Sequence, residues 1–121
     1  MKEHHCVTPE GEHFLIRQDE EGVFLCPVCG SPEFTSPPYY PDGAPSFQMC
    51  SCGFEFGFDD SRSATRDAVE GIVNNWDRWR IYVIQSRRTS KAALEELEAN
   101  LRKIGYKLAF DLIPVCIDDN T

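Results

Sequence analysis

The chain has 121 residues, of which 41% are hydrophobic, and a formal net charge of −8. This length suits one domain with its own core. No stretch approaches the roughly 18 apolar residues of a membrane-spanning helix and the first residues lack the apolar segment of a secretory signal, so we expect a cytoplasmic protein without a membrane partner.

The negative charge is concentrated in the first half of the chain. Residues 1–60 contain two basic and eleven acidic side chains, a net charge of −9, whereas residues 61–121 contain ten basic and nine acidic ones, a net charge of +1. An acidic surface repels the phosphates of nucleic acids and attracts basic proteins. We therefore expect a basic protein partner; the alternative is that the acidity only keeps the protein soluble.

The first 25 residues predict a hairpin. Two short apolar segments, Glu12–Arg17 and Gly22–Leu25, are separated by four polar residues, a pattern typical of two strands joined by a turn. We expect Cys6 to lie in a frayed terminus. The alternative is that Cys6, beside His4 and His5, is a spare metal ligand.

Two close pairs of cysteines are the most informative feature of the chain. They occur as Cys26-Pro-Val-Cys29-Gly and Cys50-Ser-Cys52-Gly, and four thiolates in two such pairs suit a tetrahedral zinc site. The glycine after each pair permits the positive φ that closes a turn around the sulfurs. The second pair is one residue shorter than ordinary zinc-ribbon spacing. We predict one structural zinc ion per chain, bound by Cys26, Cys29, Cys50 and Cys52.

Other roles for these cysteines are less favoured. In the reducing cytoplasm paired cysteines usually hold a metal, which argues against disulfides and leaves a redox or iron–sulfur role as a further alternative. Four thiolates leave no open position for water at zinc, so a catalytic zinc is not expected. A hydrolase that uses Asp59 and Asp60 lacks a recognisable base or nucleophile. We therefore predict no catalytic residue and no enzyme.

The segment between and after the cysteine pairs predicts a loop and two strands. Residues 31–45 are rich in proline, which favours a rigid loop, and Pro37-Pro38-Tyr39-Tyr40 also matches a motif that WW domains bind. Ser46–Met49 predicts a strand. In Gly53–Phe58 the residues alternate strictly, so three phenylalanines share one face, which we expect to be core; a platform for stacked bases is the alternative.

Two helices and a terminal strand are predicted for the second half. Asp59, Asp60 and Ser61 are caps for a helix over about Arg62–Gln85, although the paired aspartates could also form a second metal site. Its apolar stripe comprises Val69, Ile72, Val73, Trp76, Trp79, Val83 and Ile84. A second helix is predicted over Ser90–Ile104, with Leu94, Leu97, Leu101 and Ile104 buried and Gly105 as its stop.

The C-terminal segment predicts one extended strand. Within Tyr106–Ile117, Leu108, Phe110 and Leu112 share a face. Pro114 places the strand at an edge. Cys116 lies in an apolar run and is expected to pack as a small hydrophobic residue.

The motifs together resemble a family of small bacterial cysteine-rich proteins, the CPxCG or CPCC type. The resemblance rests on Cys26–Gly30, the proline-tyrosine loop, Ser46–Asp60 and the tryptophan-bearing helix, and it covers roughly Leu25–Trp79. The chain departs from the family pattern in its shorter second pair and in 25 additional residues before Cys26. Members are mostly uncharacterised and often lie near toxin genes, which implies an immunity or accessory role.

These observations predict an α+β domain in which a zinc-stapled, zinc-ribbon-like antiparallel hairpin packs against two helices and a C-terminal strand. The single domain, residues 1–121, would consist of an acidic zinc-ribbon half over about 12–60 and a helical half over about 61–117. We expect a non-catalytic immunity protein that neutralises a basic bacterial toxin. Its partner-binding carboxylates would be those of Asp19, Glu20, Asp59 and Asp60. The alternative is a zinc-ribbon nucleic-acid-binding or transcription accessory protein.

Overall fold

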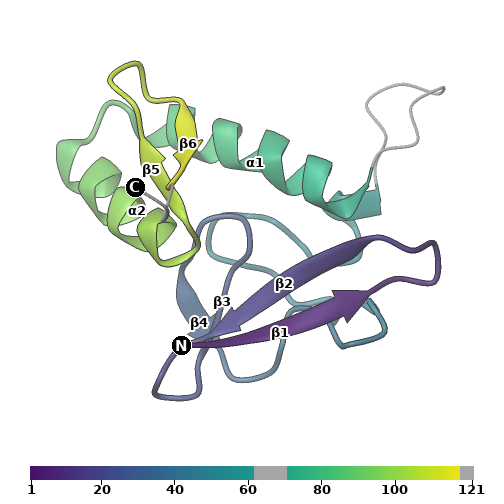
Figure 1. Ribbon diagram of the computed structural model, residues 1–121. Helices are drawn as coiled ribbons and strands as arrows, with labels where there is room; N and C mark the ends of the chain where they lie inside the picture. Colours follow the sequence, from purple (N-terminus) through teal and green to yellow (C-terminus); the bar gives the residue numbers. More distant parts are fainter. Residues whose placement is uncertain (62–70, 118–121) are drawn as a thin grey trace, which may run out of the picture.

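The chain folds as an α+β protein. A computed structural model describes residues 1–61 and 71–117, and these residues form two α-helices, a four-stranded antiparallel sheet and a two-stranded antiparallel sheet. In Figure 1, α1 runs above the long ribbon made by β1 and β2, and α2 lies with the β5–β6 hairpin at one end of α1. The predicted α+β class is therefore confirmed.

The four-stranded sheet contains two strands that the sequence did not predict, one at each edge. β1 (Lys2–Val7) pairs along its whole length with β2 (His13–Gln18), and the order continues through β3 (Phe24–Leu25) and β4 (Pro32–Phe34). Cys6 faces Phe14 in this register and is fully buried. The prediction of a frayed terminus was wrong, because the β2 edge gives the polar N-terminal segment a partner for its backbone.

The segment that carries the second cysteine pair is a short, irregular hairpin. Met49 forms a bridge with Glu55, and the amide of Phe56 donates to the carbonyl of Gln48 at 3.0 Å. Phe54 and Phe56 are buried as predicted, but Phe58 is 50% exposed. The regular strand predicted for Gly53–Phe58 is wrong, since the chain turns after Glu55 and the alternation of side chains ends there.

The first helix begins later than predicted. α1 spans Ile72–Arg87 with Gly71 as its N-cap, and the η1 turn (Asp59–Ser61) lies earlier in the chain. The predicted residues 62–70, including Val69, lie outside the described residues. The caps are instead the carboxylate oxygens of Glu12, which accept the amides of Ile72 at 2.8 Å and Val73 at 3.1 Å. A residue from the β1–β2 turn thus satisfies the free amides of the first helical turn.

The second helix agrees with its prediction, but the C-terminal segment does not. α2 spans Lys91–Lys103, and its N-cap, Ser90, accepts the amide of Ala93. The predicted single strand is a hairpin of β5 (Tyr106–Leu108) and β6 (Pro114–Cys116). Its turn leaves Phe110 fully exposed, and Cys116 is also exposed. Cys116 was predicted to pack as a small hydrophobic residue, and this prediction was wrong. A two-stranded sheet covers too little surface to bury residues at its tip and outer edge.

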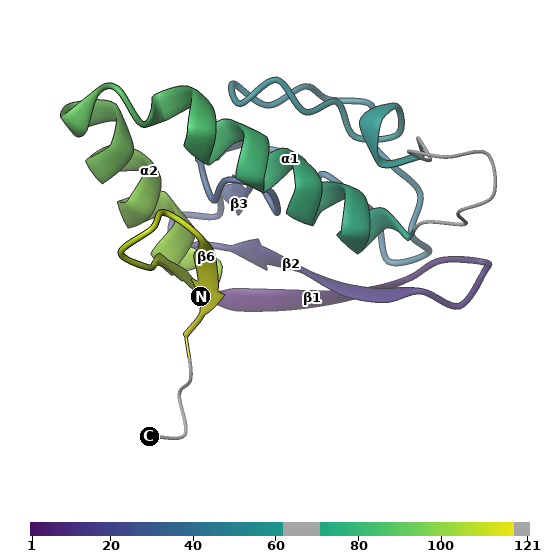
Figure 2. The same cartoon turned by 90° about the horizontal axis from the view of Figure 1, so that it is seen from above.

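An aromatic core joins the sheet to α1. Phe14 from β2 makes edge-to-face contacts with Tyr39 and Trp76, and Tyr39 makes one with Phe56. All four of these side chains are buried. Figure 1 shows α1 above the β1–β2 ribbon, and in the view from above in Figure 2 the helix crosses between this ribbon and the loops that precede η1.

Candidate metal centre

The two cysteine pairs come together at one point in the fold. Cys26 and Cys29 lie in the turn between β3 and β4, and Cys50 and Cys52 lie in the turn of the 46–58 hairpin. Their four Sγ atoms all lie within 4.8 Å of one another. Three of the four residues are buried and Cys52 is partly buried. This cluster could hold a metal ion.

The first turn is closed by hydrogen bonds around Cys26. The amide of Gly30 donates to the Cys26 carbonyl at 2.8 Å, and the amide of Val28 points at the Cys26 Sγ at 3.4 Å. Gly30 has a φ of 83°, which a side chain would disfavour. The glycine after the pair therefore has the role that the sequence predicted.

The second turn achieves a similar arrangement with one residue fewer. The amide of Gly53 donates to the Cys50 carbonyl at 2.8 Å, and the amide of Cys52 points at the Cys50 Sγ at 3.4 Å. In both turns the second residue after the first cysteine directs its amide at that sulfur. In the first turn this residue is the spacer Val28, whereas in the second it is the other cysteine itself. The shorter spacing still brings both sulfurs into the cluster.

The donor set fits a tetrahedral metal. Zinc–sulfur bonds of about 2.3 Å place thiolates about 3.8 Å apart in a tetrahedron, and the Sγ atoms of Cys29 and Cys50 lie 3.6 Å apart. A disulfide would require about 2.05 Å, and none of the cysteines is bonded to another. The sulfur spacing is therefore that of a chelate and not of a disulfide.

The charge state of the cluster also favours a cation. Burial raises the pKa of the Cys26 thiol well above its usual range, whereas hydrogen bonds from the neighbouring thiols lower the pKa values of Cys29 and Cys50. The protein groups alone therefore favour negative charge on only part of the cluster. A divalent cation would stabilise negative charge on all four sulfurs.

Two residues of α1 hold the two turns in place. Arg80, only 3% exposed, donates from Nε to the Val28 carbonyl and from Nη2 to the Pro27 carbonyl, both at 2.8 Å. Trp79 donates from Nε1 to the Cys52 carbonyl at 3.0 Å. Adjacent residues of one helix thus fix the backbones of both cysteine turns. Trp79 was predicted only as part of an apolar stripe, and Arg80 was not predicted at all.

Glu33, from β4, supports the second turn from the other side. Its carboxylate accepts the amide of Ser51 at 2.8 Å and the hydroxyl of Ser51 at 2.7 Å. The Cys50 Sγ lies 3.6 Å from the same carboxylate. This role could not be predicted from the sequence, because Glu33 lies in the proline-rich segment, far from Ser51 in the chain.

The four acidic residues predicted as a partner surface have different environments. Glu20 has a 92% exposed side chain. Asp19 and Asp59 are partly buried, and each accepts hydrogen bonds from backbone amides. Asp19 accepts the amides of Glu21 and Val23. Asp59 accepts the amide of Glu55. Asp60 is 5% exposed. The prediction that Asp60 faces a partner is therefore wrong, while the other three remain available.

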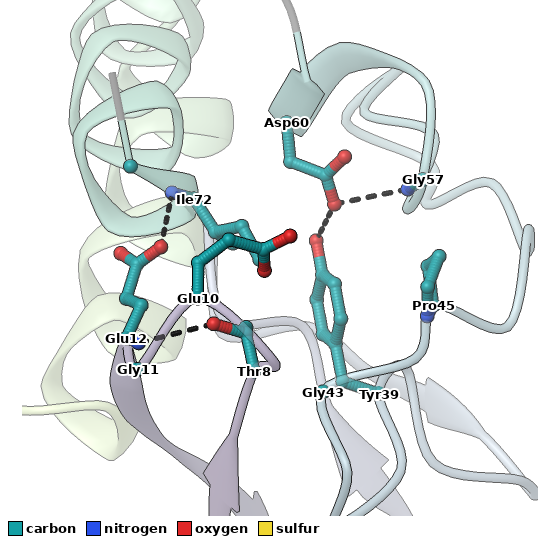
Figure 3. Close-up of a pocket in the computed structure, with 11 residues that line it drawn as sticks. Thr8, Glu10, Gly11, Glu12, Tyr39, Gly43, Pro45, Gly57, Asp60 and Ile72 are labelled. Carbon is teal, nitrogen blue, oxygen red and sulfur yellow. Dashed lines mark hydrogen bonds between the residues drawn. The ribbon is translucent and has the colours of Figure 1, made fainter. Parts of the chain in front are cut away.

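Asp60 instead lines a pocket together with Tyr39. Its carboxylate accepts the Tyr39 hydroxyl and the amide of Gly57, and Figure 3 shows this group together with Glu10 and Glu12 around a cavity of about 640 Å³. Glu12 is engaged by the first turn of α1. Two of the three carboxylates at the pocket thus accept hydrogen bonds that hold the fold.

Comparison with protein-family models, curated proteins and solved structures found no match to this chain. The resemblance to CPxCG proteins therefore stays a prediction. Among the described residues, neither helix has the length and apolar character needed to cross a membrane.

Proposed function

We propose that the cluster holds one structural zinc ion. The observation that carries this proposal is the convergence of Cys26, Cys29, Cys50 and Cys52 within 4.8 Å. Four thiolates would fill the coordination sphere of zinc, so the ion would join the two turns and supply no water for catalysis. The side chains of Arg80 and Trp79 donate hydrogen bonds to backbone carbonyls of the two cysteine turns. Hydrogen bonds of this kind keep the ligands of a metal site oriented.

Metal analysis of the protein purified under reducing conditions tests this proposal. We expect one zinc per chain, and Cys29→Ser should lose it. Cys116→Ser is the matched control and should keep it, because Cys116 is exposed and outside the cluster. Less than about half an equivalent of zinc in the wild-type protein, or the absorption spectrum of an iron–sulfur cluster, would contradict the assignment.

We further propose that the protein acts without catalysis, by binding a basic protein, most simply as an immunity protein that neutralises a bacterial toxin. The net charge of −9 on residues 1–60, with about two more negative charges from a zinc–tetrathiolate centre, supports a basic partner. Carboxylates on this half would occupy the positions that substrate phosphates take in the active site of a toxin, and the long-range attraction would raise the association rate.

Co-purification from the cells that make the protein, followed by binding measurements with the captured partner, tests the function. A basic toxin domain should be recovered, and its affinity should fall as salt rises, mainly through slower association. Recovery of nucleic acid or a polymerase subunit would favour the alternative of a transcription accessory protein.

Three substitutions that remove charge without breaking turns locate the surface. Asp19→Asn and Asp59→Asn keep an oxygen for the backbone amides that these residues accept, and Glu20→Gln completes the set. The matched control removes three exposed carboxylates from the helical half: Glu95→Gln, Glu96→Gln and Asp111→Asn. Only the first set should weaken binding. Equal effects of the two sets would show that the acidic half is not the recognition surface.

A further inference from the structure

The outer face of the hairpin around the second cysteine pair exposes two large apolar side chains. Met49 is bridged to Glu55, and the Phe47 ring lies against Gly57 two residues further along the chain. Phe47 and Met49 are 67% and 62% exposed, whereas Phe54 and Phe56 are buried. We call Phe47 and Met49 the outer hairpin face.

Phe47 has an unfavourable backbone conformation as well as an exposed side chain. Its φ is 62°, the left-handed region in which a bulky residue is an outlier. Gly57 makes room for its ring, because a Cβ there would lie 2.6 Å from a ring carbon. The chain thus has a strained phenylalanine at a position where most of the ring faces solvent. Strain of this kind tends to be kept where a side chain has a function outside the core.

The segment that carries this face holds charge of one sign. Residues 18–61, which include the whole hairpin, contain no lysine or arginine. Of their eight carboxylates, that of Glu33 contacts Ser51 of the hairpin, and those of Glu55 and Asp59 lie in the hairpin or directly after it. Glu55 lies next to Met49 in the hairpin, and its backbone amide is bound by Asp59. An apolar centre with an acidic surround has the composition of a protein interface with a polar rim.

We propose that the outer hairpin face is the anchor point for a basic protein, with Phe47 inserted into an apolar depression that basic side chains surround. This inference rests on the proposed function and specifies where that partner binds. Aromatic anchors with a charged rim supply most of the affinity in such interfaces. A second copy of this chain and a nucleic acid are disfavoured occupants, because both would bring negative charge to the acidic surround.

The stability of a Phe47 variant tests the strain argument without any partner. Asparagine tolerates the left-handed region, so Phe47→Asn should unfold at the same temperature as the wild-type protein or a few degrees higher. Phe47→Ala keeps the unfavourable φ and should unfold below Phe47→Asn. If Phe47→Asn lowers the unfolding temperature by more than about 4 °C, the ring serves to cover Gly57 and the proposal is overturned.

Photo-cross-linking in the producing cells tests the surface itself. A benzoylphenylalanine in place of Phe47 should cross-link to a basic protein. The yield of cross-linked product should fall at least tenfold when this variant also carries Asp19→Asn, Glu20→Gln and Asp59→Asn. The matched control is the same group in place of Phe110, which is fully exposed on the β5–β6 hairpin. It should give no such product.

The outcomes separate this inference from the proposed function. If a basic partner co-purifies but cross-links from position 110 and not from 47, the function stands and the outer hairpin face is overturned. If position 47 cross-links to a second copy of the chain, to nucleic acid or to a protein without excess basic charge, the proposal of a basic partner on this face is overturned. Absence of any product from position 47 also overturns it.

Discussion

A buried arginine is the residue on which the first cysteine turn depends most. The Arg80 side chain donates hydrogen bonds to the carbonyls of Pro27 and Val28. Its Nη1 lies 2.6 Å from an Asp77 carboxylate oxygen, and its guanidinium lies 4.1 Å above the centre of the Tyr106 ring. The planar fork of arginine can make these contacts together, which a lysine ammonium cannot. One side chain therefore links α1, the first cysteine turn and β5.

We predict that Arg80→Ala lowers the free energy of unfolding by about 3–5 kcal/mol, because it leaves two buried carbonyls without donors and Tyr106 without its cation. Arg80→Lys should lose an intermediate amount. Urea denaturation of the metal-loaded proteins measures both. A loss of less than about 1 kcal/mol for Arg80→Ala would mean that water replaces the guanidinium at the turn.

The buried pair of Tyr39 and Asp60 gives the fold a defined response to high pH. Burial, and then the Asp60 carboxylate beside it, raise the pKa of Tyr39 above its usual value of 10.0. An acid whose pKa is higher in the folded state keeps its proton there after the unfolded chain has lost it. Its contribution to stability is complete below pH 10 and is lost as the pH rises above that value.

We predict that the free energy of unfolding falls above pH 10 by about 1.4 kcal/mol for each pH unit on account of Tyr39. Denaturation curves at several alkaline pH values measure this slope. In Tyr39→Phe the slope should be smaller by this amount. Tyr40→Phe is the matched control, because Tyr40 is 43% exposed and its loss should leave the slope unchanged; equal slopes in the two variants would refute the assignment.

At the level of elements, α2 packs directly onto the first cysteine turn. A Cβ on Gly30 would lie 2.0 Å from the Asn100 carbonyl oxygen in α2. This contact involves backbone on both sides, so it cannot be relieved by a side-chain rotation. The glycine that closes the turn around Cys26 therefore also sets how closely the helix approaches.

We predict that Gly30→Ala lowers the free energy of unfolding by about 2–5 kcal/mol, the sum of left-handed strain and overpacking. Gly11→Ala is the matched control: Gly11 has a φ of 90°, but no atom lies within 4 Å of an added Cβ. It should lose about 1 kcal/mol from strain alone. Thermal unfolding followed by circular dichroism measures both; equal losses would mean that α2 shifts to accommodate the methyl group.

For the whole molecule, the cysteine cluster lies where the sheet, the 46–58 hairpin and both helices meet. Cys26, Cys29 and Cys50 belong to the same buried cluster as Trp76 and Leu101. The two halves therefore share one core, and loosening the centre should affect the helices as well as the turns.

We predict that removal of the metal by a chelator under reducing conditions abolishes the cooperative unfolding transition or lowers its midpoint by tens of degrees, because binding energy at such sites, of order 10 kcal/mol, is also folding energy. Helical circular dichroism and tryptophan emission should change together, since Trp79 bonds to the Cys52 carbonyl. Cys116→Ser should respond as the wild-type protein does. An unchanged midpoint after the metal is shown to be gone would refute this.

The sequence by itself determined the features that depend on neighbouring residues. The positions of the two cysteine pairs, their closing glycines and α2 were all predicted, because turns and helices involve hydrogen bonds across only a few residues. The convergence of the four cysteines was also predictable, since two such pairs have the spacing of a site with four thiolate ligands.

Only the tertiary structure decided the features that depend on distant partners. β1 exists because β2 is there to pair with it, and α1 starts at Ile72 where Glu12 supplies its cap. Asp60 is buried because Tyr39 donates to it, and Arg80 is buried because the first cysteine turn presents two carbonyls. From the neighbouring residues alone, the side chains of Asp60 and Arg80 would be predicted to be exposed to solvent. The cost of burying each of these side chains is offset by hydrogen bonds to a partner that only the fold brings close enough.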